Sequence, residues 1–302
     1  MRTILVIGAS GFIGRRIAKA LLAGGHAVRC LARDPAKVQD LATVGCEIVK
    51  GDISDLDSMK QALISVQAVY IAIHTISPQP ASAAGQRFMA VELNGLQNIV
   101  TACQAHGARR LIYVTSLGIA VDASSEWLRE RWRAEQFLLT SGLDVTVIRP
   151  GMIVGVGGRG FGMVASQARK SDAIGMGGRQ KMRSIAVDDL IYYLVGVLDD
   201  PRAYRQCYDV GNDDVLTNSQ MIDAAAEIFG RRHPPKLKVP WTLLGALAPL
   251  LERVGKLPRG AIKGLVDSQK DDTGGDPMPI RSILPRSLLS FRQAAERALA
   301  VD

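Results

Sequence analysis

The sequence lacks the features that mark zinc-binding, secreted and membrane-spanning chains. It has four cysteines, none of them paired at C-x-x-C spacing, so a zinc site is not indicated. The longest apolar stretch, residues 241–251, is shorter than the ~20 residues that a membrane span needs. Met1 to Thr3 lead directly into a strand-like segment, with no cleavable apolar region before it. We therefore expect no metal, no transmembrane segment, buried free thiols and a cytoplasmic location.

The charge balance is basic, but the basic residues do not form a stripe. Lys and Arg number 37 against 29 Asp and Glu, a net charge of +8. The densest basic segment holds Arg129, Arg131 and Arg133, and Glu130 and Glu135 interrupt it. A nucleic-acid surface needs a clustered basic face, so no nucleic-acid partner is expected. With 302 residues, 47% of them hydrophobic, the chain should fold as one large domain or two lobes.

The first half of the chain alternates short apolar runs with helical patterns. Strands are expected at residues 4–7, 27–31, 47–49, 68–73, 111–115 and 145–148. Helices are expected at 12–23, at 56–64 after a capping box of Ser54 and Asp57, and at 126–140. A short helix should also begin at residue 35, and a long one should end at residues 106–107. Such alternation indicates a parallel sheet covered on both faces. We predict an α/β fold, a Rossmann-like doubly wound parallel sheet over residues 1–154 with returning elements to about residue 215.

The second half has a different pattern. Five glycines between residues 155 and 162 predict a flexible segment directly after the sixth strand. Helices are expected at 188–198, 219–229, 241–254 and 290–299, with a loop at 271–279. Residues 155–302 are therefore predicted to form a smaller, mixed but mostly helical lobe for a substrate or a protein partner. The apolar segment 241–251 would form its core, roof an apolar substrate pocket, or dock on a partner or a membrane surface.

A glycine motif at the first strand–helix junction carries the strongest functional signal. It reads Gly8-Ala9-Ser10-Gly11-Phe12-Ile13-Gly14, after a predicted strand and at the start of a predicted helix. Gly8 suits a tight turn, Gly11 lets the backbone approach a pyrophosphate, and Gly14 permits close packing of helix on strand. Because a helix N-terminus favours negative charge, the motif predicts dinucleotide binding.

The spacing G-x-x-G-x-x-G resembles that of the short-chain dehydrogenase/reductase superfamily, in its extended and atypical branches, and the atypical NmrA-like group most closely. Three further segments carry the resemblance: Gly51-Asp52-Ile53 as the adenine contact, Tyr113 to Ser116 as the fifth strand with the catalytic serine, and Arg149-Pro150-Gly151 beside the nicotinamide. The motifs cover residues 1–200, and the remaining third matches weakly. The resemblance implies an NAD(P)-binding protein with cofactor contacts from Gly8, Ser10, Gly11, Phe12, Ile13, Gly14, Arg33, Lys37, Asp52, Ile53, Ala72, Ile73, His74, Thr115, Ser116, Arg131, Pro150, Gly151, Met152 and Ile153.

The end of the second strand bears on the choice of cofactor. An acidic residue there would bind the ribose 2′-hydroxyl of NAD, whereas an arginine accommodates the 2′-phosphate of NADP. The chain has Arg33 before Asp34, with Lys37 nearby. Arginine suits phosphate because its planar fork is bidentate and always charged. NADP(H) is therefore expected over NAD(H), with an Arg33–Asp34 ion pair as the alternative.

The family's catalytic Tyr-x-x-x-Lys pair is absent. Its two positions fall on Trp127 and Arg131, neither of which titrates in the working range. Arg131 could still hold a ribose or phosphate, and Trp127 either stacks on a substrate or packs in a core. Ser116 remains and either hydrogen-bonds a carbonyl or only caps the end of the strand. His74, at the end of the fourth strand, either supplies a proton or only lines a loop.

Two classes of function therefore stay open. The first is an NADPH-dependent reductase of a small organic acceptor, a carbonyl, an enone or a quinone. The second is a non-catalytic NADP(H)-binding regulator or assembly factor of the NmrA-like type, which the missing Tyr/Lys pair favours. A sugar-nucleotide epimerase is a weaker third, because that chemistry also resembles a Tyr/Lys-dependent one.

Overall fold

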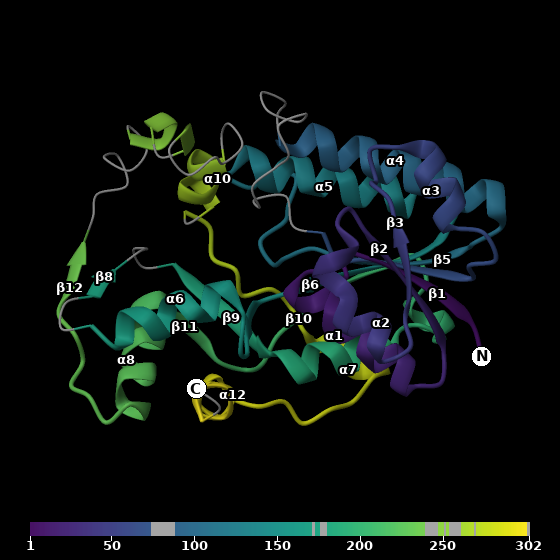
Figure 1. Cartoon of the computed structure of the whole chain (residues 1–302). Helices are drawn as coiled ribbons and strands as arrows, with labels where there is room; N and C mark the ends of the chain where they lie inside the picture. Colours follow the sequence, from purple (N-terminus) through teal and green to yellow (C-terminus); the bar gives the residue numbers. More distant parts are fainter. Residues whose placement is uncertain are drawn as a thin grey trace.

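The computed structural model describes residues 1–73, 88–170, 173–175, 180–238, 247–250, 252–253, 261–268 and 270–300. They form a large sheet between two helical layers, with a second, smaller lobe beside it (Figure 1). The sheet contains β1 (Thr3–Ile7), β2 (Ala27–Ala32), β3 (Glu47–Lys50), β4 (Ala68–Ile71), β5 (Arg110–Val114), β6 (Asp144–Pro150) and β10 (Gln206–Val210). The strand order is β10-β6-β5-β4-β1-β2-β3, and every pairing is parallel. The predicted doubly wound α/β fold is confirmed, and its strand order reverses between β1 and β4, where such sheets bind ligands.

Helices cover both faces of this sheet because its strands are apolar on both. In β1, Ile4 and Val6 face one side, Leu5 and Ile7 face the other, and all four are buried. The first side packs against α1 (Phe12–Ala23), α2 (Gln39–Thr43) and α7 (Val187–Gly196). The second side packs against α3 (Leu56–Ala62), α4 (Phe88–His106) and α5 (Glu126–Leu139). Figure 1 shows these helices on opposite sides of the sheet.

The second lobe combines short strands with helices. A three-stranded sheet contains β7 (Met152–Val154), β9 (Lys181–Ala186) and β11 (Val215–Thr217), while β8 (Ala173–Gly175) pairs with β12 (Lys236–Lys238). The later helices are α6 (Arg159–Ala168), α8 (Asn218–Ile228), α10 (Ala261–Ser268), α11 (Met278–Ile283) and α12 (Phe291–Leu299). Of these, α10 packs on α5 and α11 packs on β10, with Ile280 in the core of the large sheet. Among these, α6, α8 and α12 share one apolar core. The short strands were not predicted from the sequence. α7 and β10 pack with the large sheet and lie within the range, to about residue 215, in which returning elements were expected.

Two local predictions are wrong. The glycine segment 155–162 is not flexible throughout, because Gly158 is the N-cap of α6. Phe161, Val164, Ala165 and Ala168 recur at helical spacing and are buried, so core packing outweighs the poor helix propensity of the glycines. The cap of α3 is Asp55 rather than Ser54, since the Asp55 carboxylate accepts hydrogen bonds from the backbone N–H groups of residues 57 and 58.

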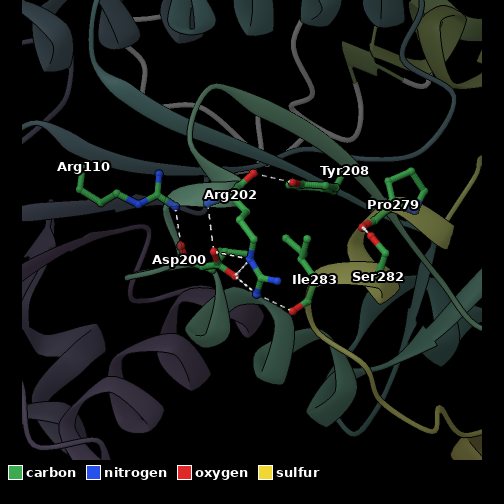
Figure 2. Close-up of polar contacts among 8 residues, drawn as sticks. Arg110, Asp200, Arg202, Tyr208, Pro279, Ser282 and Ile283 are labelled. Atoms are coloured by element: carbon green, nitrogen blue, oxygen red, sulfur yellow. Dashed lines mark hydrogen bonds and ion pairs between the residues drawn. The ribbon is translucent and has the colours of Figure 1, made fainter.

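Buried polar contacts stabilise the edge of the sheet at which the parallel strands begin, opposite to the edge formed by their carboxyl ends. Arg110, the first residue of β5, is buried and donates to the carbonyl oxygens of Val197 (2.7 Å) and Leu198 (2.9 Å), just past the end of α7. The partial negative charge of a helix C-terminus stabilises such a cation. Figure 2 shows Arg110 near the ion pair of Arg202 with Asp200 (2.7 Å). This edge is therefore occupied by structural contacts, and the predicted functional residues lie at the other one.

Candidate functional site

The glycine loop between β1 and α1 presents an open helix N-terminus. Gly8 has φ +90°, and its carbonyl accepts from the Gly11 N–H at 2.9 Å, which closes the predicted tight turn. Gly11 is the N-cap of α1, whose first turn contains no acidic residue. Ser10 and Gly11 are exposed. The positive end of the helix is thus accessible to an anion such as a pyrophosphate.

The three glycines of the loop serve different purposes. A Cβ on Gly14 would lie 2.6 Å from the carbonyl carbon of Gly8, and one on Gly8 would lie 2.8 Å from that of Ala72. These two glycines are required by packing inside the protein. A Cβ on Gly11 would meet only the Gly8 oxygen, at 3.1 Å. The middle glycine is therefore the one whose missing side chain leaves room for a ligand.

The end of β2 presents two cations. The side chains of Arg33 and Lys37 are exposed. The Asp34 carboxylate accepts from the Ala36 N–H at 3.2 Å and caps the short 3-10 helix Pro35–Val38. No Arg33–Asp34 ion pair forms among the residues that the structure describes. The alternative account of Arg33, as a residue paired with Asp34, is therefore not supported.

The ends of β3 and β4 bring the next predicted residues to the same edge. Asp52 is half-buried, and its carboxylate accepts from the N–H (2.9 Å) and hydroxyl (2.8 Å) of Ser54. Ile53 packs on α4, where a Cβ on Gly95 would lie 2.7 Å from its side chain. Ala72 and Ile73 follow β4 and are half-buried. His74 lies outside the described residues.

At the end of β5, Thr115 and Ser116 have contrasting surroundings. The Thr115 hydroxyl is buried and donates to the Glu135 carboxylate at 2.7 Å. The Ser116 hydroxyl oxygen is also buried, yet it has no hydrogen-bond partner within the described parts of the chain. Buried hydroxyls in folded proteins are normally paired, so an unpaired one at this edge is a candidate ligand contact.

Glu135 connects β5, β6 and α5. Its fully buried carboxylate accepts from Thr115 and from two nitrogens of Arg149, including Nε at 3.0 Å. Burial raises the pKa of the Glu135 carboxyl, and the hydrogen bonds from Arg149 and Thr115 oppose that rise. Asp209 of β10 lies 3.8 Å from another Arg149 nitrogen. This cluster links the carboxyl ends of β5, β6 and β10, next to Ser116.

The two positions of the missing catalytic pair pack against other parts of the protein. Arg131 is 2% exposed and pairs with Glu92 of α4 at 3.4 Å. The same carboxylate accepts from the buried Tyr113 hydroxyl, and burial raises the pKa of that phenol well above its usual value. Trp127 is half-buried and packs beside Gly264 of α10. This pairing does not support the ribose role of Arg131, which stays a prediction.

The segment after β6 is set by close backbone contacts. The Gly151 N–H donates to the Val210 carbonyl at 2.9 Å, and a Cβ on Gly151 would lie 2.8 Å from the carbonyl carbon of Arg183. Pro150 is buried, while Met152 and Ile153 are half-buried in β7. These residues carry the chain from the sheet into the second lobe, beside the ends of β5 and β6.

A cavity of about 330 Å³ lies past the ends of β5, β6 and β10. Gly118 and Ala120 contribute apolar lining, and Arg149 contributes a cation. Its four acidic residues are Asp122, Asp209, Asp271 and Asp272. Sequence reasoning missed this polar lining, as it missed Glu92 and Glu135, because the residues come from segments far apart in the chain. The sequence signal that could have drawn attention to Glu135 was its i, i+4 spacing from Arg131 on one predicted helix.

The cysteines do not form a nucleophilic site. Cys30, Cys46 and Cys103 are buried, Cys207 is half-buried, and all four are free thiols. Burial raises the pKa of Cys103 and of Cys207 to about 12. These two thiols are therefore protonated at neutral pH and poor nucleophiles. Within the described ranges, no helix is long and apolar enough to cross a membrane.

Comparisons with known proteins identify the family of this chain. The family model described as NAD(P)H-binding matches residues 8–201. The NAD(P)H azoreductase of Xenophilus azovorans is 25% identical over 232 residues, 76% of this chain and 74% of that protein. The photosystem II assembly factor Ycf39 of Cyanophora paradoxa is 31% identical over 147 residues, which are 49% of this chain and 44% of that factor.

Solved structures share the fold. The NADPH complex of the quinone oxidoreductase QOR2 from Escherichia coli superposes with a TM-score of 0.76 at 20% identity, covering 98% of this chain and 99% of that chain. At that identity the likeness concerns the fold alone. The structural match nevertheless covers the second lobe as well. The family model, by contrast, ends at residue 201.

Proposed function

Because the chain belongs to the NAD(P)H-binding family, we propose that it is an NADPH-dependent reductase of a small organic acceptor, a carbonyl, an enone or a quinone. The observation that carries the proposal is the buried Ser116 hydroxyl, which has no partner in the described part of the chain. Leaving such a group unpaired costs about 1–3 kcal/mol, which an acceptor oxygen would offset. The similarity to a reductase over three quarters of the chain favours the same class.

The residues at the carboxyl ends of the strands fit a nicotinamide dinucleotide. The open backbone at Gly11 and the acid-free first turn of α1 would hold the pyrophosphate. Asp52 and Ile53 would contact the adenosine half, and Gly151 to Ile153 would line the nicotinamide side. When bound, the reduced cofactor supplies a hydride.

The chain's own part in the reaction is to orient the acceptor and to stabilise its developing charge. Ser116 donates a hydrogen bond to the acceptor oxygen, and this bond strengthens as negative charge grows there. Trp127 and Arg131 do not titrate in the working range, so they do not supply the proton. His74, which follows Ile73 in the sequence, is the proton donor that we propose, with solvent as the alternative.

Substituting Ser116 and His74 tests this division of roles. Ser116→Ala should lower kcat about tenfold through the loss of one hydrogen bond, and leave the Kd for NADPH unchanged. In the wild type, kcat should fall as pH rises through about 6.5, where histidine loses its proton, and His74→Phe should flatten that profile. Steady-state rates across pH measure both effects, with the exposed Ser166→Ala as control. Full rates for His74→Phe at every pH would make solvent the proton source.

Arg33 is proposed to select NADPH. Arg33→Ala should weaken NADPH binding about ten- to a hundredfold and leave NADH binding nearly unchanged, because only NADPH carries the 2′-phosphate. Calorimetric titration with each cofactor measures this difference. Arg232→Ala, at another exposed arginine in the second lobe, serves as the charge-matched control. Equal weakening of both cofactors would remove the basis for the NADP preference.

A non-catalytic regulator or assembly factor is the second candidate. The observation that favours it is the burial of Arg131 against Glu92, in the position where the superfamily places its lysine. NADPH oxidation across a panel of carbonyls and quinones, with binding measured separately, distinguishes the two. Tight NADPH binding without turnover would favour the regulator. A sugar-nucleotide epimerase ranks third, because that chemistry also resembles one that depends on the missing Tyr/Lys pair.

A further inference from the structure

Phe12, the first residue of α1, is half-buried and packs against a glycine turn from the second lobe. The guanidinium carbon of Arg16 lies 4.2 Å from the centre of the Phe12 ring. A Cβ built on Gly155 or on Gly158 would lie 3.4 or 3.3 Å from the tip of that ring. The ring therefore lies against bare backbone, at a spacing that leaves little room for a side chain.

Arg16 ties the same two segments together by hydrogen bonds. Its guanidinium donates to the Phe12 carbonyl at 3.0 Å and to the Val156 carbonyl at 2.9 Å. Burial lowers the pKa of Arg16, and the nearby Asp188 carboxylate opposes that shift. One side chain of α1 thus links the glycine loop to a segment 140 positions later in the chain.

The turn leads directly into α6. Gly157 has φ +86°, and the Gly158 N–H donates to the Gly155 carbonyl at 3.0 Å. Gly158 is the N-cap of α6, whose buried face belongs to the core of the second lobe. Residues 155–158, hereafter the glycine turn, therefore connect the Phe12 ring to that core.

We propose that the glycine turn fixes the position of the Phe12 ring and thereby of the loop from Gly8 to Gly14, so that cofactor affinity depends on a segment of the second lobe. This inference rests on dinucleotide binding at Gly8 to Gly14, not on turnover. Phe12 follows Gly11, and its backbone is part of the α1 N-terminus that would receive the pyrophosphate. Displacing the ring therefore displaces the backbone that binds the ligand, and small displacements at such sites are costly.

Gly158→Ala tests the proposal. Gly158 has φ −72° and ψ 119°, which alanine adopts without backbone strain. The added methyl group would lie 3.1 Å from the carbonyl oxygens of Ile153 and Gly155 and 3.3 Å from the Phe12 ring, so it crowds both the turn and the ring. We expect the Kd for NADPH to rise about tenfold, equivalent to about 1.4 kcal/mol. Gly162→Ala is the matched control, because a Cβ there meets no atom within 4 Å. Its Kd should equal that of the wild type.

Two further variants separate positioning from general destabilisation. In the Gly158→Ala background, Phe12→Leu should recover part of the lost affinity, because the smaller side chain makes room for the methyl group. Arg16→Met removes the hydrogen bond to Val156 without adding bulk, and should raise the Kd even if Gly158→Ala fails to fold. Thermal melting is recorded for every variant, so that changes in Kd and Tm are compared directly.

The outcomes are distinct. Weaker NADPH binding by Gly158→Ala and Arg16→Met, with rescue by Phe12→Leu, supports the proposal. Wild-type Kd values in a folded Gly158→Ala variant, or in Arg16→Met, would overturn it. If the wild type binds NADPH but reduces no acceptor, the reductase function fails while this proposal stands, since the measurement is of binding. If the wild type binds no dinucleotide, this proposal fails too.

Discussion

Gly11→Val should abolish dinucleotide binding and leave the fold intact. The Gly11 backbone, at φ −84° and ψ 170°, lies in the extended region that any residue adopts. Its Cβ would lie 3.1 Å from the Gly8 oxygen and within 4 Å of no other described residue beyond its neighbours in the chain, so in the free protein the substitution requires a small shift of the loop and no displacement of the core. The branched side chain then stands where the pyrophosphate approaches the helix N-terminus, which should weaken NADPH at least about a hundredfold. Calorimetry and thermal melting measure the two effects separately.

Gly14→Ala is the contrasting variant from the same motif. Its Cβ would lie 2.6 Å from the Gly8 carbonyl carbon, inside the packing of helix on strand. Overpacking of this kind costs about 1–3 kcal/mol, so Tm should fall markedly for Gly14→Ala and little for Gly11→Val. Equal NADPH affinities of Gly11→Val and the wild type would refute the assignment of the loop as the pyrophosphate site.

Glu135→Leu should be among the most destabilising single substitutions in the sheet. Glu135 is fully buried, and removing it leaves the Thr115 hydroxyl without its acceptor and the Arg149 guanidinium with only Asp209 at 3.8 Å. Breaking a buried ion pair from one side costs about 3–5 kcal/mol. Urea denaturation followed by circular dichroism measures this loss, provided that the slope with denaturant stays constant.

The double variant Glu135→Leu with Arg149→Met is its control. Replacing both members of a buried pair by apolar side chains is often close to neutral, because no uncompensated charge remains. The double variant should therefore be more stable than Glu135→Leu alone. If the double variant loses as much free energy of unfolding as Glu135→Leu and Arg149→Met lose together as single variants, the two residues are not coupled. The cluster would then not stabilise the strand ends as described.

The strand–helix alternation and the glycine motif could be predicted from the sequence because their causes are local. Runs such as residues 4–7 are apolar at every position, and their short length and β-branched residues favour a strand buried on both faces. The spacing of Gly8, Gly11 and Gly14 specifies the turn and the helix start within seven residues. By contrast, α6 was missed because core packing of Phe161 and Val164 outweighs the local signal of the glycines around them.

What the tertiary structure alone decided is which polar side chains meet. Arg131, which could hold a ribose or phosphate, is paired with Glu92 because α4 packs beside α5, and the two residues are 39 positions apart. Glu135 reaches Thr115 and Arg149 only because α5 packs across β5 and β6. The contact of Phe12 with the glycine turn joins two lobes that no local pattern connects. Local sequence sets backbone conformation through propensity and periodicity, whereas side-chain pairing depends on the packing of whole elements, which is a property of the folded chain.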